Sequence, residues 1–546
     1  MILMKHPNPE DLNDGVLDHR GDALPYLSKS AKNMKMDKLL ETPMPKYSGS
    51  TPGSYFWTKI LYWICHRISA VQFRKRQISG LEHIPADRGT LCCAWHTNGL
   101  LDALEITLNH PKYFVFGARH DLVTRPMLGW WTRKMAVQPV VRKAELLRGG
   151  CSEEEANFLN GRSLLTLSSG IAHGFGCVLF PEGTSHNNSH MLRFRTGPVR
   201  TILAAGAIAS SLGKELPVLV PIGLHFRVRE YFRTDVWVEF GTPIQILKSD
   251  IPDELIEAVS KGSWSEPPAE NVFNLRDRLR LEMEPLTPNV AEWEEYRALH
   301  LLGHLSRRII GNQPKSWKDE VLAAREIRDI IVEPKQSIVN DEPKPEPIDH
   351  EILKPAISAA NILHQSGLDG RDLDSKGMDL RFANIAHLPL SLIRSTAFLL
   401  LLPIFLLSLG PQVALGRILG DSTDEGIDAR TSYQFLASMF GSLIIWPIAS
   451  SIIILIGCLQ ESNISNLIGF EWTEIFGSGI LFNLISIIMV WLLCFPVFWL
   501  SGKLGSLAWD DFTYLRNFFR RQKMSKSDRQ NLKGLMKILI QEIKKI

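Results

Sequence analysis

A histidine and an aspartate stand where a predicted strand passes into a predicted helix. The run TLCCAW at 90–95 is short and apolar, which predicts a buried strand, and His96 follows it directly, with Asp102 six positions later. In α/β proteins, functional groups gather where strands end. A carboxylate about one helical turn away can accept a hydrogen bond from the imidazole, so that the second ring nitrogen can remove a proton from an alcohol. The pair indicates general-base chemistry, with a surface ion pair as the alternative.

A second predicted strand leads into a glycine turn at 177–186, which reads CVLFPEGTSH. Backbone N–H groups and hydroxyls in such a turn can receive an anion. Guanidinium groups match phosphate oxygens in pairs, and four arginines stand near such strand ends. These are Arg142, Arg193, Arg195 and Arg200. We expect Glu182 to pair with these arginines or to hydrogen-bond an acceptor hydroxyl. The alternatives are plain surface charges and a simple ion pair.

The order of these motifs resembles that of the glycerophospholipid acyltransferases, which acylate glycerol 3-phosphate, dihydroxyacetone phosphate or lysophosphatidic acid. The chain shows GLEHIP, then His96-x5-Asp102, QPVVR, FPEGTSH followed by RTG, VPIGLHF and VEFGTPI. The resemblance covers about residues 78–246. It is strongest to the subset with H-x-N-x-x-x-D and FPEG-x-S. It implies an α/β acyltransferase domain with a mixed sheet flanked by helices.

The resemblance also implies roles for single residues. His96 corresponds to the general base and Asp102 to the carboxylate that orients it. The predicted substrate-binding set is Arg142, Glu182, Gly183, Thr184, Ser185, Arg193, Arg195 and Gly197. The acyl-donor side is predicted at Val220, Pro221 and Ile222. Because five residues separate the pair instead of the more common four, we expect a looser first helical turn capped by Asn98.

Other chemistries are disfavoured. His186 and His190 are four positions apart, but no third ligand with metal spacing follows, so we expect no metal site. The chain has no G-x-S-x-G elbow, no Walker pattern and no dinucleotide glycine pattern. The balance of 61 Lys and Arg against 58 Asp and Glu argues against a nucleic-acid partner. The seven cysteines form no C-x-x-C pair, which suits a reducing compartment.

The C-terminal third predicts a membrane region. The stretches 433–459 and 475–501 contain no charged residue and are long enough to span a bilayer. The stretch 388–419 is also apolar, but it contains Arg394 and three prolines. We favour a re-entrant or interfacial hairpin there over a full crossing. The basic amphipathic tail at 503–546 can lie on an anionic membrane surface or form a solvated helix.

Charge bias predicts the orientation of this integral membrane protein. The loop between the two firm spans carries three glutamates and no cation, whereas the tail from Lys503 onward has eleven Lys and Arg against four acids. Basic segments stay in the cytoplasm, so we expect the catalytic domain and the tail on the cytoplasmic face. No apolar run follows Met1, which argues against a cleaved signal peptide.

The predicted organisation follows from these patterns. It comprises a loosely ordered segment at 1–54, an acyltransferase domain at 55–260 with an amphipathic N-terminal helix, a helical annex at 261–331, a linker at 332–350, a helical connector at 351–387, the membrane region at 388–502 and the tail at 503–546.

The predicted function is that of a membrane-bound acyltransferase in phospholipid synthesis. It would move a fatty acyl group from acyl-CoA or acyl-carrier protein, as co-substrate, to glycerol 3-phosphate or lysophosphatidic acid, with no bound cofactor. Expected partners are these small molecules and membrane lipids. The alternatives are another lysolipid or alcohol as acceptor, or an inactive membrane scaffold. The oligomeric state stays open.

Overall fold

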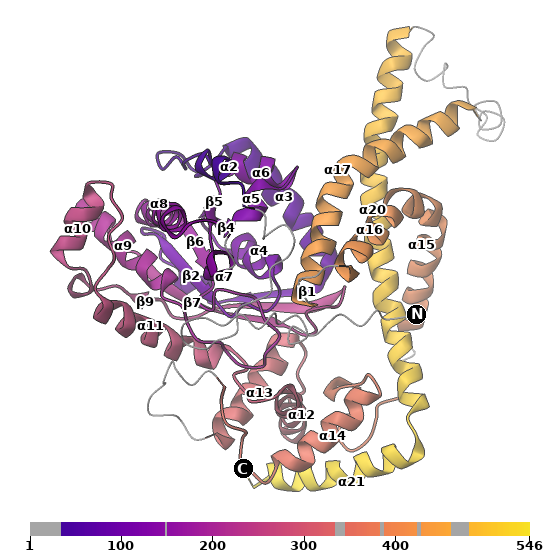
Figure 1. The fold of residues 1–546 in the computed structure, drawn as a ribbon. Helices are drawn as coiled ribbons and strands as arrows, with labels where there is room; N and C mark the ends of the chain where they lie inside the picture. The colour runs from indigo at the N-terminus through magenta and orange to yellow at the C-terminus, as the bar shows by residue number, and fades with distance from the viewer. Residues whose placement is uncertain are drawn as a thin grey trace.

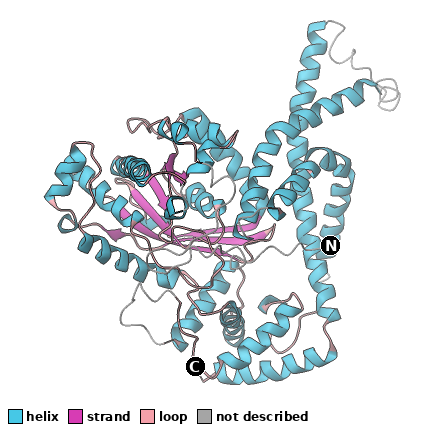
Figure 2. Ribbon diagram, viewed as in Figure 1, coloured by secondary structure: helices cyan, strands magenta, loops and turns pink. Residues whose placement is uncertain are grey.

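A mixed sheet lies at the centre of the N-terminal half of the chain (Figures 1 and 2). The computed structural model describes residues 34–147, 150–332, 344–382, 387–422, 427–459 and 480–545. The main sheet has the order β1-β8-β7-β2-β6-β3, and β9 pairs with β7. Its strands are β1 (Phe73–Ser79), β2 (Thr90–Ala94), β3 (Phe114–Val115), β6 (Gly176–Leu179), β7 (Val218–Phe226), β8 (Thr234–Phe240) and β9 (Ile244–Gln245). The expected mixed sheet flanked by helices is confirmed.

Strand β2 is buried from end to end because its neighbours β6 and β7 both run parallel to it. A central parallel strand has both faces covered and reads as a continuous apolar run. Leu91 and Cys93 point into the core on one face, and Cys92 and Ala94 into the core on the other. The run at 90–95 therefore folds as its composition predicts.

Helices cover both faces of the sheet (Figure 2). One face packs against helices that begin after residue 150, and the other packs against α3 and α4. The covering helices are α3 (Tyr55–Gln72), α4 (Leu100–Asn109), α8 (Glu153–Ala172), α9 (Gly197–Ser211), α10 (Asp253–Ser260) and α11 (Ala269–Met283). Helix α3 buries Ile64 and Cys65 on the domain and leaves Phe56 and Trp63 exposed.

A small two-stranded sheet and four short helices complete the N-terminal half. The strands β4 (Gly117–Arg119) and β5 (Gln138–Val140) pair in parallel. The helices are α2 (Met36–Leu40), α5 (His120–Thr124), α6 (Leu128–Lys134) and α7 (Lys143–Leu147). Most of the predicted loose segment at 1–54, namely 1–33, lies outside the described residues.

A second, all-helical core joins the annex, the connector and the C-terminal tail. It is built from α12 (Trp293–Ile309), α13 (Trp317–Ile331), α14 (Leu353–Gln365) and α21 (Lys526–Ile543). The apolar face of α21 is buried there, with Leu532, Met536 and Leu539 at most 1% exposed. The described tail helix therefore buries its apolar face against the annex and the connector, which favours the alternative of a helix with a solvated outer face over one on a membrane surface.

In the described part of the predicted membrane region there are four further helices: α15 (Leu388–Ser408), α16 (Gly410–Asp421), α17 (Ile427–Leu459) and α20 (Ile480–Lys523). Three of these, α15, α17 and α20, are long and apolar enough to cross a membrane. Helix α20 does not end at Lys503. It includes the charged residues that follow, up to Lys523. The predicted start of the second span at 475–479 and the acidic loop before it lie outside the described residues.

Helices α15 and α16 form a hairpin beside α17 and α20 (Figure 1). Along α15, Arg394 pairs with Asp511 and Leu409 at its end lies against Gly502, so α15 runs antiparallel to α20. Helix α16 then returns along α17, and Asp421 at its end pairs with Arg430. Both ends of the hairpin therefore lie near the N-terminal α/β domain.

Candidate active site

The predicted histidine and the predicted turn lie side by side at one edge of the sheet. Strands β2 and β6 are parallel neighbours, with Cys93 opposite Leu179. The carboxyl ends of parallel strands meet at the same edge, so the residues that follow them come together. The amide N–H of His186 donates to the carbonyl of His96 across 3.1 Å and joins the two loops.

Asp102 holds both the imidazole and the backbone of the loop around His96. One of its carboxylate oxygens accepts from His96 Nδ1 at 2.9 Å and from the amide N–H groups of Thr97 and Asn98 at 2.7 Å each. The Asp102 side chain is fully buried, and that of His96 is 16% exposed. A carboxylate that already accepts from two amides requires a hydrogen on Nδ1, which leaves Nε2 with a lone pair.

The first turn of α4 differs from our expectation. Helix α4 begins after Gly99, which adopts φ 50° and ψ −128° and provides no side-chain cap. The positive φ of Gly99 accommodates the extra residue between His96 and Asp102, because glycine adopts it without steric cost. Asn98 does not cap the helix. Its side-chain oxygen accepts from Thr431 of α17 instead.

Glu182 binds the loops around it. It is 3% exposed, and its carboxylate accepts from the His96 amide at 2.9 Å, from the Leu192 amide at 2.7 Å and from His186 Nε2 at 2.9 Å. A buried carboxylate with three such donors is a fixed structural anchor. The expectation that Glu182 pairs with the arginines or with an acceptor hydroxyl stays a prediction.

Phe180 and Gly183 shape the turn after β6. The Phe180 ring stacks on the His96 imidazole, with ring centroids 3.8 Å apart and an interplanar angle of 10°. The Gly183 amide donates to the Phe180 carbonyl, and Gly183 has φ +74°, a conformation that favours glycine. Thr184 and Ser185 follow, and the Thr184 hydroxyl donates to the Ser185 carbonyl. The stacking contact is one that motif spacing did not indicate.

The predicted arginines fall into two groups. The Arg195 amide donates to the Pro181 carbonyl, and its side chain passes close to Gly183, so this residue borders the turn. Arg193 precedes it on the same loop, and Gly197 starts helix α9 just beyond. Arg200 lies in α9 and pairs with exposed Glu266.

Arg142 lies apart, after β5 of the small sheet. Its guanidinium pairs with Glu145 at 2.6 Å, and its amide N–H donates to the same carboxylate. Glu145 is fully buried. This partner was missed, although its spacing of three residues from Arg142 on a helix is a signal that a sequence search could use.

The predicted acyl-donor residues lie inside the sheet. Val220, Pro221 and Ile222 pair in register with 92–94 of β2. Val220 and Ile222 are fully buried in the core. These side chains set the packing behind the strand that carries His96, and they present no polar surface.

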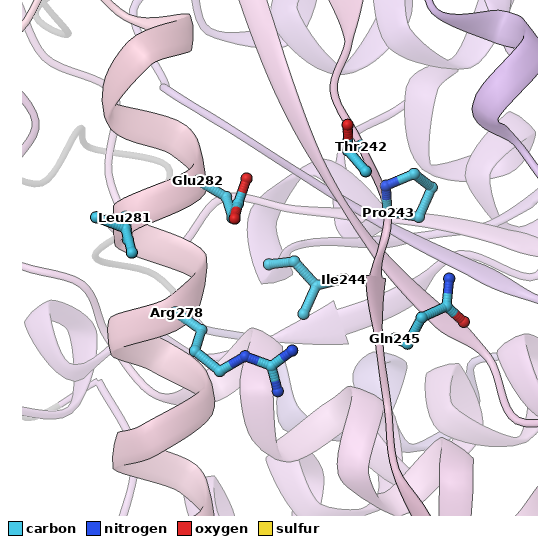
Figure 3. Close-up of a pocket in the computed structure, with 7 residues that line it drawn as sticks. All are labelled: Thr242, Pro243, Ile244, Gln245, Arg278, Leu281 and Glu282. Carbon is cyan, nitrogen blue, oxygen red and sulfur yellow. The ribbon is translucent and has the colours of Figure 1, made fainter.

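Two other features do not belong to this edge. A surface hollow between β9 and α11 is lined by Thr242, Pro243, Ile244, Gln245, Arg278, Leu281 and Glu282 (Figure 3). None of these residues belongs to the two loops around His96. Among the residues that the structure describes, no group of three or more His, Cys, Asp or Glu side chains is placed to hold a metal ion.

The structure thus places a histidine that is bonded to a buried carboxylate beside a glycine turn and an arginine, at one edge of the sheet of an α/β domain. Residues 75–224 match the family model described as Acyltransferase. This match covers less than a third of the chain, and it confirms that this domain resembles the acyltransferases. The finer assignment to the His-x5-Asp subset stays a prediction.

Three known proteins are similar to parts of the chain. Glycerol-3-phosphate O-acyltransferase 2 of Saccharomyces cerevisiae is 27% identical over 151 residues, covering 28% of this chain and 19% of its own. Glycerol-3-phosphate O-acyltransferase 1 of the same yeast is 31% identical over 107 residues, covering 17% and 14%. The 1-acyl-sn-glycerophosphate (LPA) acyltransferase PlsC from Thermotoga maritima is 18% identical, covering 38% of this chain and 78% of its own, with a TM-score of 0.25. The chain thus matches about a fifth or less of its yeast relatives.

Proposed function

We propose that this chain is a membrane-bound O-acyltransferase that moves a fatty acyl group from a thioester to the free hydroxyl of a glycerol-phosphate-type acceptor. The observation that carries the proposal is the His96–Asp102 pair, at 2.9 Å, beside the turn after β6 in an acyltransferase-family domain. The two yeast relatives are glycerol-3-phosphate O-acyltransferases by name, which supports this acceptor class.

The proposed reaction uses His96 as the general base. Its Nε2 takes the proton of the acceptor hydroxyl as that oxygen attacks the thioester carbonyl carbon. The tetrahedral adduct then expels the thiolate, and the imidazolium returns the proton to the sulfur. Buried Asp102 stabilises the imidazolium and keeps Nδ1 as the donor. The ester and the free thiol are the products.

The acceptor phosphate would bind at the turn and its arginines. Arg195 borders Gly183, and Thr184, Ser185 and Arg193 lie on the same pair of loops. A guanidinium beside turn amides suits a phosphate dianion, and fixing the phosphate places the distant hydroxyl near His96. Arg142, held by Glu145, is the second proposed phosphate ligand. Glu182 acts by holding the His96 amide.

The membrane region fits a reaction whose product belongs in a bilayer. We place α17 and the apolar half of α20 across the membrane and α15–α16 as a re-entrant hairpin. Helix α20 returns to the catalytic domain, where Asp510 pairs with Arg233, and to the connector, where Arg521 pairs with Asp372. The catalytic domain and the tail helix therefore share one face, which we assign to the cytoplasm from the charge bias of the tail.

An acceptor competition assay on the purified full-length protein tests this function. The protein in lipid nanodiscs would receive radiolabelled acyl-CoA with glycerol 3-phosphate, lysophosphatidic acid, lysophosphatidylcholine or monoacylglycerol. We expect transfer to one of the two phosphate monoesters at least tenfold faster than to the other two acceptors. Repeating the assay with acyl-carrier protein as donor identifies the thioester. If no acceptor is acylated from either donor, the proposed function is wrong and the alternative of an inactive membrane scaffold is favoured.

A further inference from the structure

The second turn of α17 touches the loop that carries His96. The hydroxyl of Thr431 donates to the side-chain oxygen of Asn98 at 2.5 Å, and the hydroxyl of Ser432 accepts from the amide of Leu100 at 2.9 Å. These contacts join residues more than 300 positions apart in the chain. Thr431 and Asn98 are both fully buried. A helix of the membrane region therefore completes the surroundings of the active-site loop.

Ser432 supplies an acceptor that α4 lacks. The first amides of a helix have no partner within the helix and need a cap. Gly99 precedes α4 and has no side chain to provide one. The Ser432 hydroxyl binds the amide of Leu100, the first residue of α4, and so acts as a cap supplied by another helix.

Thr431 acts through Asn98 on both loops of the site. The Asn98 side-chain nitrogen donates to the carbonyl of Arg229. The Arg229 guanidinium donates to the carbonyls of Thr97 and His186, at 3.1 Å each. One chain of hydrogen bonds therefore runs from α17 to the residue after His96 and to the loop after the glycine turn. A buried network of this kind has one favoured arrangement when all its members are satisfied.

The part of α17 around these two hydroxyls is itself firmly placed. Phe435 and Met439, on the next two turns, are 1% and 3% exposed and pack in the same core as Leu101 of α4. Arg430 pairs with Asp421 of α16 at 2.9 Å. The hydroxyls of α17 are therefore carried on a rigid support on the side of the catalytic domain, as a positioning group requires.

We propose that Thr431 and Ser432 are positioning residues of the active site, through which the membrane region sets the loop between β2 and α4. The inference rests on the proposed function for its catalytic consequence. It gives the membrane region a second role besides anchoring, because His96 takes its place relative to α17 and hence to the bilayer. Neither residue belongs to the region that matches the acyltransferase family.

Three substitutions in the full-length protein test this role. Thr431→Val keeps the shape of the side chain but removes its hydroxyl, and Ser432→Ala removes the acceptor of the Leu100 amide. We expect each to lower kcat about tenfold with the KM for the acceptor within twofold, because the phosphate-binding arginines are untouched. Thr431→Ser keeps the hydroxyl and should restore most of kcat. The matched control is Ser438→Ala on the same helix, whose hydroxyl bonds the carbonyl of Gln434 within α17.

Hydrogen exchange provides a readout that does not depend on activity. We expect the peptide that covers 96–102 to exchange at least fivefold faster in Thr431→Val and Ser432→Ala than in the wild type or Ser438→Ala. Wild-type rates for kcat and exchange in both variants would overturn the proposal. Ser432→Ala removes a single oxygen, so it decides the matter if Thr431→Val fails to fold. If the wild type transfers no acyl group, the proposed function fails, and exchange alone then decides whether α17 positions the loop.

Discussion

Two regions of the catalytic domain pair a histidine with a carboxylate at nearly the same distance, yet their surroundings differ. His96 Nδ1 lies 2.9 Å from Asp102, and His225 Nε2 lies 3.1 Å from Glu239. The His96 side chain is 16% exposed at a sheet edge, whereas that of His225 is 4% exposed within a sheet. Pairing alone therefore does not identify a catalytic histidine.

The elements that cover His225 explain the difference. His225 lies inside β7, opposite Trp237 of antiparallel β8, and its ring stacks on that tryptophan with centroids 4.6 Å apart. Helix α13 covers this place, where Arg325 binds Glu239 and the Trp317 indole donates to the His225 carbonyl. Strand β7 ends one residue later, at Phe226, so the helix cover and not the distance from a strand end sets this pair apart.

The electrostatics of the covered pair suit a structural role. Burial lowers the pKa of His225. Burial also raises the pKa of Glu239, but hydrogen bonds from His225 and Arg325 outweigh it and bring the pKa to about 2. The covered region thus holds a neutral histidine beside an ionised carboxylate. In the edge region, the carboxylate of Asp102 binds only Nδ1 of His96, so Nε2 is left to bind a substrate.

The largest expected effect separates the two histidines by activity. His96→Ala should lower kcat by about 10²–10⁴-fold, the range for loss of a general base, with little loss of folded protein because the side chain is partly exposed. His225→Gln should leave kcat per folded molecule within threefold and reduce the yield of folded protein. Steady-state acyl transfer, normalised to monodisperse protein, measures both. Equal losses of kcat in the two variants would contradict the assignment of His96.

The next effect separates the regions by stability. Glu239→Gln removes the carboxylate that His225 and Arg325 share, and we expect it to lower the free energy of unfolding by about 2 kcal/mol, as for hydrogen bonds to charged groups. Denaturant titration of the detergent-solubilised protein measures the loss. The matched control is Glu257→Gln, whose partner Lys261 and own side chain are more than 60% exposed, so that its effect should be close to zero.

Lowering the pH should lower the free energy of unfolding over a defined pH window, because His300 is buried. Burial lowers the pKa of His300, which stacks on Trp317 of α13, from 6.5 to about 3. The unfolded chain therefore binds this proton first as the pH falls, so stability is complete above about pH 6.5 and decreases down to about pH 3. Each such group contributes up to about 1.4 kcal/mol per pH unit in that window.

His300→Phe tests this window. It removes the titrating ring and keeps the stacked shape, so the thermal midpoint of the variant should fall less between pH 6.5 and 4 than that of the wild type. Differential scanning fluorimetry across this range gives both slopes. Identical slopes would show that His300 titrates equally in the folded and unfolded chains.

Much of this arrangement could be predicted from local patterns. The apolar run before His96 predicts β2, and alternation of short runs with helical segments predicts the α/β domain. The spacing of His96 and Asp102 placed both at one strand end. Each of these signals lies within a few residues of the chain, where periodicity and composition have direct structural meaning.

Contacts between distant segments could not be predicted in this way. Glu182 bonds the His96 amide across 86 positions, and Thr431 bonds Asn98 across 333. The residue type shows that a buried carboxylate or hydroxyl needs a hydrogen-bond partner. It does not show which distant residue will be that partner. The apolar face of α21 has the same pattern whether it meets a membrane or a helix bundle, so only the packing of Met536 and its neighbours distinguishes the two.

The smallest expected effect concerns Phe180, whose ring helps to hold the imidazole of His96 in place. Phe180→Leu removes the ring that stacks on His96 at 3.8 Å and keeps an apolar side chain. An aromatic stack contributes about 0.5–1.5 kcal/mol beyond its buried area, which predicts a kcat about three- to tenfold lower with KM unchanged. Phe180→Tyr keeps the ring and should restore kcat, while Phe232→Leu, at a 40% exposed position, is the matched control. A kcat for Phe180→Leu equal to that of the control would mean that Asp102 alone fixes the imidazole, and the edge region would then differ from the covered one only in exposure.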